Sequence, residues 1–245
     1  MHWEYFLNKI REGFYTQFLM HLLSLVVIIL YFFIKPKTKS LTFLVIIAIA
    51  SFIESLTADF SDLIQKPIFI AIGAITIGGY LFIEIIYFLF FIKEHIQSRL
   101  AKKIISNTPF VFIGYTIILV ISAFLTRHST TALHAKVTTC LSNVFSIESF
   151  LIIMSCLYFF YELFIHNPIK ENLSLPAIWA ISGMLILSGT IIPFFLFAIY
   201  LAKNNQLMMH RLWAINYIAY SLLFITFIMA MLSDKKLTSF RKNTF

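Results

Sequence analysis

Charge and cysteine are both scarce in this sequence of 245 residues, and the short motifs of common enzyme active sites are missing. Only 12% of the residues are charged while 60% are hydrophobic, which leaves too little polar surface to cover a water-soluble fold. The two cysteines, Cys140 and Cys156, are too few for a disulfide framework and do not form a Cys-x-x-Cys pattern for zinc. No Gly-x-Ser-x-Gly motif and no glycine-rich phosphate loop occurs. These absences exclude most soluble enzymes and indicate a membrane protein.

Seven long apolar runs, separated by short polar breaks, are the main feature of the sequence. A helix needs about 20 apolar residues to cross a hydrocarbon core of about 30 Å. Runs such as 41–51 and 81–92 are almost continuously apolar, whereas strands of a membrane barrel alternate apolar and polar residues. We therefore predict an all-α, polytopic bundle of seven transmembrane helices that forms a single domain over 1–245. The predicted spans are 15–34, 41–60, 68–92, 109–126, 144–165, 176–201 and 212–232.

The basic residues predict the orientation in the membrane. Of the 19 Lys and Arg residues, 12 follow the first, third, fifth and seventh spans, and 7 lie on the other side. Cytoplasmic loops are enriched in Lys and Arg, so we expect the N-terminus outside and a basic tail from about residue 233 inside. Anionic membrane lipids account for the net charge of +8, and nucleic acid is not expected as a partner. Ile96, Leu100 and Ile104 follow helical spacing within 93–107, which predicts an interfacial helix on the inner surface.

Three glutamates inside the predicted spans are the most informative polar residues. An ionisable group in hydrocarbon costs at least about 2.5 kcal/mol unless it faces protein or water. Glu54 and Glu148 lie in the outer thirds of their spans, so they share a depth. Glu84 is deeper, and Tyr80 and Tyr87 flank it at helical spacing. For Glu84 two interpretations stay open: a proton-sensitive switch, or a hydrogen-bonded carboxyl that holds helix contacts.

Polar side chains of the first and seventh spans repeat at helical spacing and reach the depth of Glu54 and Glu148. The hypothesis is that four helices line an outward-opening pocket for a small ligand. The expected lining is His21, Glu54, Glu148, Asn216 and Tyr220, with Gln17 and Tyr217 at the mouth. The alternative is that the same groups only satisfy one another as an interhelical hydrogen-bond network.

The sixth span contains small residues followed by a proline. Gly183 and Gly189 would let neighbouring helices approach closely. Pro193 lacks the N–H that would bond to the Gly189 carbonyl, so a kink is expected there. We therefore predict a hinge at Gly189 and Pro193. The fourth span has few polar residues and is expected to be peripheral.

The positions of histidine and lysine argue against metal and retinal chemistry. His21 is the only histidine well inside a predicted span, so a membrane metal hydrolase is not expected. A single-metal site of His21, Glu54 and Glu148 stays open as a minor alternative. Residues 212–232 contain no lysine that could form a Schiff base with retinal. We therefore expect no cofactor and no enzymatic activity.

Two segments carry a resemblance to a known group of proteins. They are LSNVFSIESFLIIMSCLYFFYELF, with Asn143 and Glu148, and PAIWAISGMLILSGTIIPFFLF, with Trp179, Gly183 and Gly189. Together they resemble uncharacterised small seven-helix bacterial membrane proteins, some of which accompany sensor histidine kinases. The resemblance implies a sensor component of the bacterial inner membrane, with a histidine kinase as the signalling partner.

These observations lead to an expected function. We expect a receptor-like module that detects a small or lipidic ligand from the outer side and signals through a cytoplasmic or membrane partner. The alternatives are a transporter of small solutes, proton-coupled or not, and a purely structural or assembly role. Whether the protein forms a homo-oligomer stays open at this stage.

Overall fold

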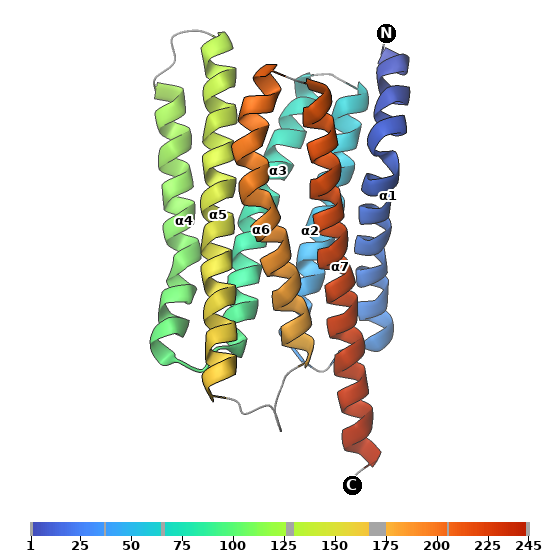
Figure 1. Cartoon of the computed structure of the whole chain (residues 1–245), viewed down its shortest axis with the longest axis vertical. Helices are drawn as coiled ribbons and strands as arrows, with labels where there is room; N and C mark the ends of the chain where they lie inside the picture. Colours follow the sequence, from blue (N-terminus) through green and yellow to red (C-terminus); the bar gives the residue numbers. More distant parts are fainter. Residues whose placement is uncertain are drawn as a thin grey trace.

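The computed structural model consists of seven long helices, and the part of the chain that it describes contains no strand. It describes the backbone except at residues 1, 37, 65–66, 126–129, 167–174, 205 and 244–245. Side chains are described mainly within 15–60, 75–122, 143–165, 176–195 and 214–235. The helices are α1 (His2–Ile34), α2 (Leu41–Ile64), α3 (Pro67–His95), α4 (Arg99–Leu125), α5 (Thr130–His166), α6 (Leu175–Asn204) and α7 (Gln206–Asn243) (Figure 1).

Each helix contains a segment that is long and apolar enough to cross a membrane. The prediction of an all-α, seven-span bundle is therefore confirmed, and the chain is a multi-pass membrane protein. α7 continues to Asn243 beyond the rest of the bundle (Figure 1). The spans are Tyr15–Ile34, Leu41–Phe60, Ile75–His95, Arg99–Ser122, Asn143–Ile165, Pro176–Phe195 and Ala214–Lys235.

The region after α3 differs from the prediction. α4 already begins at Arg99, so the predicted interfacial helix over 93–107 and the predicted start of the fourth span at 109 are both wrong. Capping fixes the true start, because the Ser98 hydroxyl oxygen accepts a hydrogen bond from the Ala101 N–H at 3.4 Å. Pro109 lies inside the helix, which membrane helices tolerate because nearby groups can satisfy the freed carbonyl.

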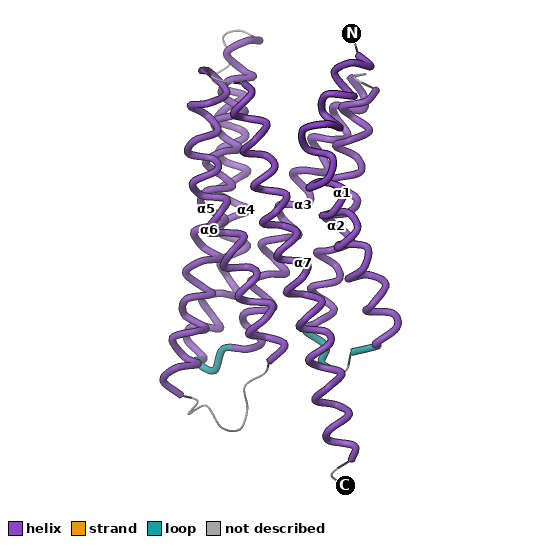
Figure 2. The backbone as a smooth tube through the Cα atoms, turned by 45° about the vertical axis from the view of Figure 1, so that its right-hand side comes forward, coloured by secondary structure: helices purple, strands orange, loops and turns teal. Residues whose placement is uncertain are grey.

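The helices form two rows that are closed at both ends. One row holds α5, α6 and α7, and the other holds α2 and α3 (Figures 1 and 2). α1 packs against α2 and α7 at one end, and α4 packs against α3 and α5 at the other. The predicted peripheral position of the fourth span is thus confirmed. Across the rows, α3 contacts α5 and α6, and α2 contacts α7.

Large side chains fill the space between the rows. Phe88 of α3 and Phe227 of α7 meet edge to face with ring centroids 6.5 Å apart, and both are fully buried. Cys156 is also buried in this core as a free thiol, while the side chain of Cys140 lies outside the described residues. The bundle is therefore packed through its centre by aromatic and aliphatic groups, and buried polar residues interrupt that packing at defined levels.

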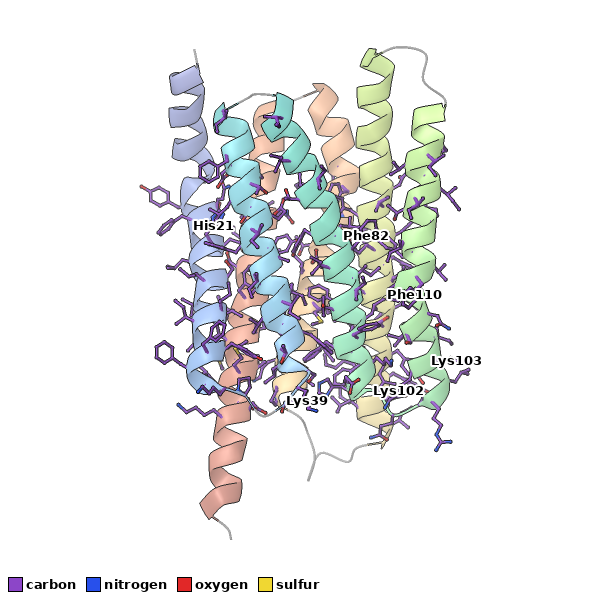
Figure 3. All side chains as sticks on the ribbon, turned by 180° about the vertical axis from the view of Figure 1, so that it is seen from behind. His21, Lys39, Phe82, Lys102, Lys103 and Phe110 are labelled. Carbon is purple, nitrogen blue, oxygen red and sulfur yellow. The ribbon has the colours of Figure 1, made fainter. Side chains whose placement is uncertain are left out.

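The two termini lie at opposite ends of the bundle, and we call these ends the N-end and the C-end (Figure 1). The N-end holds the starts of α3, α5 and α7, and the C-end holds the starts of α2, α4 and α6. Lys39, Lys102 and Lys103 lie at the C-end (Figure 3).

Candidate functional site

The predicted pocket residues separate into two groups, of which the first lies between α1 and α2. The Gln17 amide donates a hydrogen bond to Oδ1 of Asp59. His21 Nδ1 donates to the Gln17 carbonyl at 2.8 Å, and its Nε2 lies 3.8 Å from Asp59 Oδ2. Since Nδ1 already carries a hydrogen, Nε2 can donate to the carboxylate only when the ring is protonated. We call Gln17, His21 and Asp59 the α1–α2 group.

Asp59 is the residue of this group that the sequence analysis missed. It lies at the end of the second predicted span, and its side chain is 42% exposed. It nevertheless holds Gln17 and His21 of α1 against α2. His21 also contacts the Phe52 ring edge to face, with centroids 6.1 Å apart. His21 therefore links α1 to α2 through Asp59 and Phe52.

The second group lies between the two rows of helices and is built by α3, α5 and α7. The Tyr220 hydroxyl donates a hydrogen bond to Glu84 Oε2 at 3.3 Å, and both residues are buried. The Tyr80 ring lies beside the Tyr220 ring, with centroids 6.3 Å apart. Glu148 of α5 is buried within electrostatic range of Glu84 and Tyr220, and the buried Asn216 lies one helical turn before Tyr220 on α7. We call Tyr80, Glu84, Glu148, Asn216 and Tyr220 the interior polar layer.

Glu84 is close enough to Glu54 and Glu148 for their charges to influence one another. Glu54 is only partly buried on α2. Tyr217 lies within range of Glu54 and Asp59, so it stands between the interior polar layer and the α1–α2 group. Glu84, which the sequence placed deeper, thus joins the layer because the long Tyr220 side chain reaches it.

Three polar atoms of the interior polar layer have no hydrogen-bond partner among the described residues: Tyr80 Oη, Glu148 Oε1 and Asn216 Oδ1. Their residues are 6%, 3% and 8% exposed. The Tyr80 hydroxyl lies beside the Glu84 carboxyl and the Tyr220 hydroxyl but reaches neither with hydrogen-bond geometry. A buried polar atom without a partner costs about 1–3 kcal/mol, so native structures rarely leave several together.

The predicted hinge residues of α6 lie on the outside of the bundle. Gly189 and Pro193 are both exposed, and no neighbouring atom lies within 4 Å of the position that a Cβ on Gly189 would take. Pro193 lies within a helix that continues from Leu175 to Asn204. Gly183 is the glycine of α6 that touches another helix, since a Cβ there would lie 1.9 Å from Thr226 Oγ1 of α7. The hinge itself stays a prediction.

A second set of polar contacts ties the helices together at the C-end, and its main residue is Glu162 of α5. This buried carboxylate accepts the Gln97 N–H at 2.6 Å and the Ser98 N–H at 3.0 Å, both in the connection from α3 to α4. A count of every acidic residue inside the predicted spans would have found it. Two more contacts lie at this end: Ser40 Oγ to His95 Nε2 at 3.2 Å, and Thr38 Oγ1 to Asp234 Oδ1.

The arrangement does not favour a metal ion. No group of three His, Cys, Asp or Glu side chains is close enough to hold one within the portion of the chain that is described. The minor alternative of a site at His21, Glu54 and Glu148 is therefore wrong, because His21 faces Asp59. What the interior polar layer offers is a set of hydrogen-bond acceptors between three helices.

Comparison with known family models, curated proteins and solved structures finds no match to this chain. The class of the protein consequently comes from its own fold: an α-helical multi-pass membrane protein with buried polar residues between its rows of helices.

Proposed function

We propose that this protein is a receptor-like module of the bacterial inner membrane that binds a small ligand in the interior polar layer. The observation that carries this proposal is the set of three unpartnered, buried polar atoms on α3, α5 and α7. A permanent network would pair these atoms, whereas a ligand site leaves them available. The basic residues favour the N-end outside, so the ligand would arrive from the outer side.

The same three helices offer a route from the layer to the C-end. α3 carries Glu84 in the layer and His95 at its last turn, where His95 meets Ser40. α7 carries Tyr220 in the layer and Asp234 at the C-end before it continues to Asn243. α5 carries Glu148 and Glu162. A change in the layer would therefore shift the C-end, where we propose that a partner such as a histidine kinase binds.

The test is thermal unfolding of the purified protein in the presence of fractionated small-molecule extract from cells that produce it. We expect at least one fraction to stabilise the wild-type protein, because a ligand that binds only the folded state raises its unfolding temperature. Glu148→Gln should lose this stabilisation. Glu94→Gln, at an exposed position of α3, is the matched control and should keep it. Equal stabilisation of all three proteins, or of none, would contradict the proposal.

A transporter is the second candidate, and the position of Glu84 favours it. Glu84 lies near the middle of the Ile75–His95 span, where carboxyl groups of proton-coupled carriers are found. Flux separates the two functions. For a receptor-like module, proteoliposomes that contain a pH-sensitive dye should show no proton or solute uptake when the active fraction is added. Uptake that Glu84→Gln abolishes would instead establish transport.

A further inference from the structure

The carboxyl and amide oxygens of the interior polar layer outnumber its hydroxyl and NH2 groups. Its carboxyl groups are Glu84 and Glu148, with Glu54 in electrostatic range. The hydroxyl of Tyr220 is already used as a donor to Glu84. Of the three unpartnered atoms, Glu148 Oε1 and Asn216 Oδ1 are carboxyl and amide oxygens that serve as acceptors. Tyr80 Oη can donate or accept, so the two oxygens that can only accept are the atoms that lack a donor.

Among the residues whose side chains are described, those that could supply this donor are engaged or lie elsewhere. His21 contacts Gln17 and Asp59 in the α1–α2 group. All the described Lys and Arg side chains belong to the C-end or to the last turns that lead to it: Lys35, Lys39, Lys93, Arg99, Lys102, Lys103 and Lys235. Within the described residues, the carboxyl groups of the layer thus face no cationic partner.

We propose that the interior polar layer binds a small protonated amine. This inference rests on the proposed function and names the ligand class of the same site. An ammonium group donates up to three hydrogen bonds and carries the positive charge that the carboxyl groups lack. An anion would be repelled, and a neutral donor would leave the charge of any ionised carboxyl unbalanced.

The positions of the unpartnered atoms assign a role to each residue. Glu148 and Asn216 accept N–H bonds from the amine, and Glu84, held by Tyr220, provides the second carboxyl. The Tyr80 ring is beside this position and presents its hydroxyl to Glu84. Aromatic rings attract desolvated cations, which adds to the preference for a positively charged ligand. Multivalent metal ions are disfavoured because the described side chains supply no group of three ligands.

The closing experiment is a titration with methylammonium chloride, followed by thermal unfolding of the purified full-length protein. Tetramethylammonium chloride has the same charge but no N–H, and sodium chloride controls for ionic strength. We expect a saturable rise in unfolding temperature with methylammonium alone. Glu148→Gln and Asn216→Ala should each raise the apparent dissociation constant by about tenfold to a hundredfold, the effect of losing a charge-assisted hydrogen bond. Glu94→Gln should bind as the wild type does.

Tyr80→Phe is a second variant of the same layer for the case in which Glu148→Gln or Asn216→Ala does not fold. It removes only a hydroxyl group. We expect it to weaken methylammonium binding less than Glu148→Gln does. Equal stabilisation by tetramethylammonium or sodium, or unchanged binding by Glu148→Gln, would overturn the amine assignment.

The outcomes also separate this inference from the proposed function. If methylammonium has no effect while an extract fraction still stabilises the wild type and not Glu148→Gln, the ligand class is wrong and the receptor site stands. If neither methylammonium nor any extract fraction stabilises the protein, the amine assignment and the proposed receptor function are both wrong.

Discussion

At residue 183 the backbone of α6 lies so close to α7 that only glycine fits. A Cβ there would lie 1.9 Å from Thr226 Oγ1 and 3.3 Å from Leu223 Cδ1. Thr226 cannot move freely, because its hydroxyl donates to the Leu223 carbonyl at 2.7 Å. Small residues of this kind let membrane helices approach and gain van der Waals contact. The close approach of α6 to α7 at this position therefore requires a residue without a Cβ.

Gly183→Ala should destabilise the protein by about 1–3 kcal/mol, the usual cost of overpacking a tight contact. Thermal unfolding in detergent checks this. Gly189→Ala on the same helix is the matched control. It has open space around the new Cβ, so its stability should change by less than about 1 kcal/mol and in the favourable direction. Adding Thr226→Ala to Gly183→Ala should restore part of the loss. Equal stability of the two glycine variants would refute this account of the contact.

At the scale of a helix, a carboxylate from a distant part of the chain contributes to where α4 begins. Glu162 of α5 accepts two backbone N–H groups just before Arg99, and the Ser98 hydroxyl accepts a third from Ala101. The first N–H groups of a helix lack partners within the helix, and these oxygens supply them. Charge-assisted bonds of this type are stronger than neutral ones. Glu162 therefore joins α3, α4 and α5 at the C-end.

Glu162→Ala should loosen this connection while the bundle stays folded. The two N–H groups would lose partners worth about 1.5–3 kcal/mol each, so amide exchange at Gln97 and Ser98 should accelerate by at least about tenfold. Hydrogen–deuterium exchange of a peptide that covers 96–98 measures this exchange rate. Glu94→Ala removes an exposed carboxylate from the same region and should leave exchange unchanged. Unchanged exchange in Glu162→Ala would show that the cap has no energetic role.

At the scale of the whole molecule, the seven crossings put the two termini on opposite sides of the membrane (Figure 1). Of the 19 basic residues, 12 belong to the side that contains the C-terminus. This bias favours a cytoplasmic C-end. For the proposed receptor function, this orientation would bring the ligand from the N-end.

The orientation is checked by cysteine labelling in intact cells. In a background with Cys140 and Cys156 replaced by serine, Thr130→Cys lies at the start of α5 at the N-end, and Gln97→Cys lies between α3 and α4 at the C-end. A membrane-impermeant thiol reagent should modify Thr130→Cys and spare Gln97→Cys until the cells are opened. The reverse pattern would place the N-terminus inside.

The sequence predicted the helices better than it predicted their polar contacts. The second span, 41–60, has the predicted limits because a bilayer sets its length and apolar character. The start of the fourth span was wrongly predicted at Pro109, because part of what holds the true start is a hydrogen bond from the Ser98 N–H to Glu162, which is 64 residues away. His21 was grouped with Glu54 and Glu148 on depth alone, and depth does not say which way a helix is rotated.

The sequence by itself determined that this protein lies in a lipid bilayer and crosses it as helices. Long apolar runs must cross a bilayer as helices, since an unpaired backbone has no partner in hydrocarbon. Only the tertiary structure decided which polar groups meet. Glu84 reaches Tyr220, and His21 faces Asp59, because helix rotation and the two-row arrangement follow from side-chain packing between distant segments. That packing depends on three-dimensional fit, which hydrophobic periodicity along the chain does not encode.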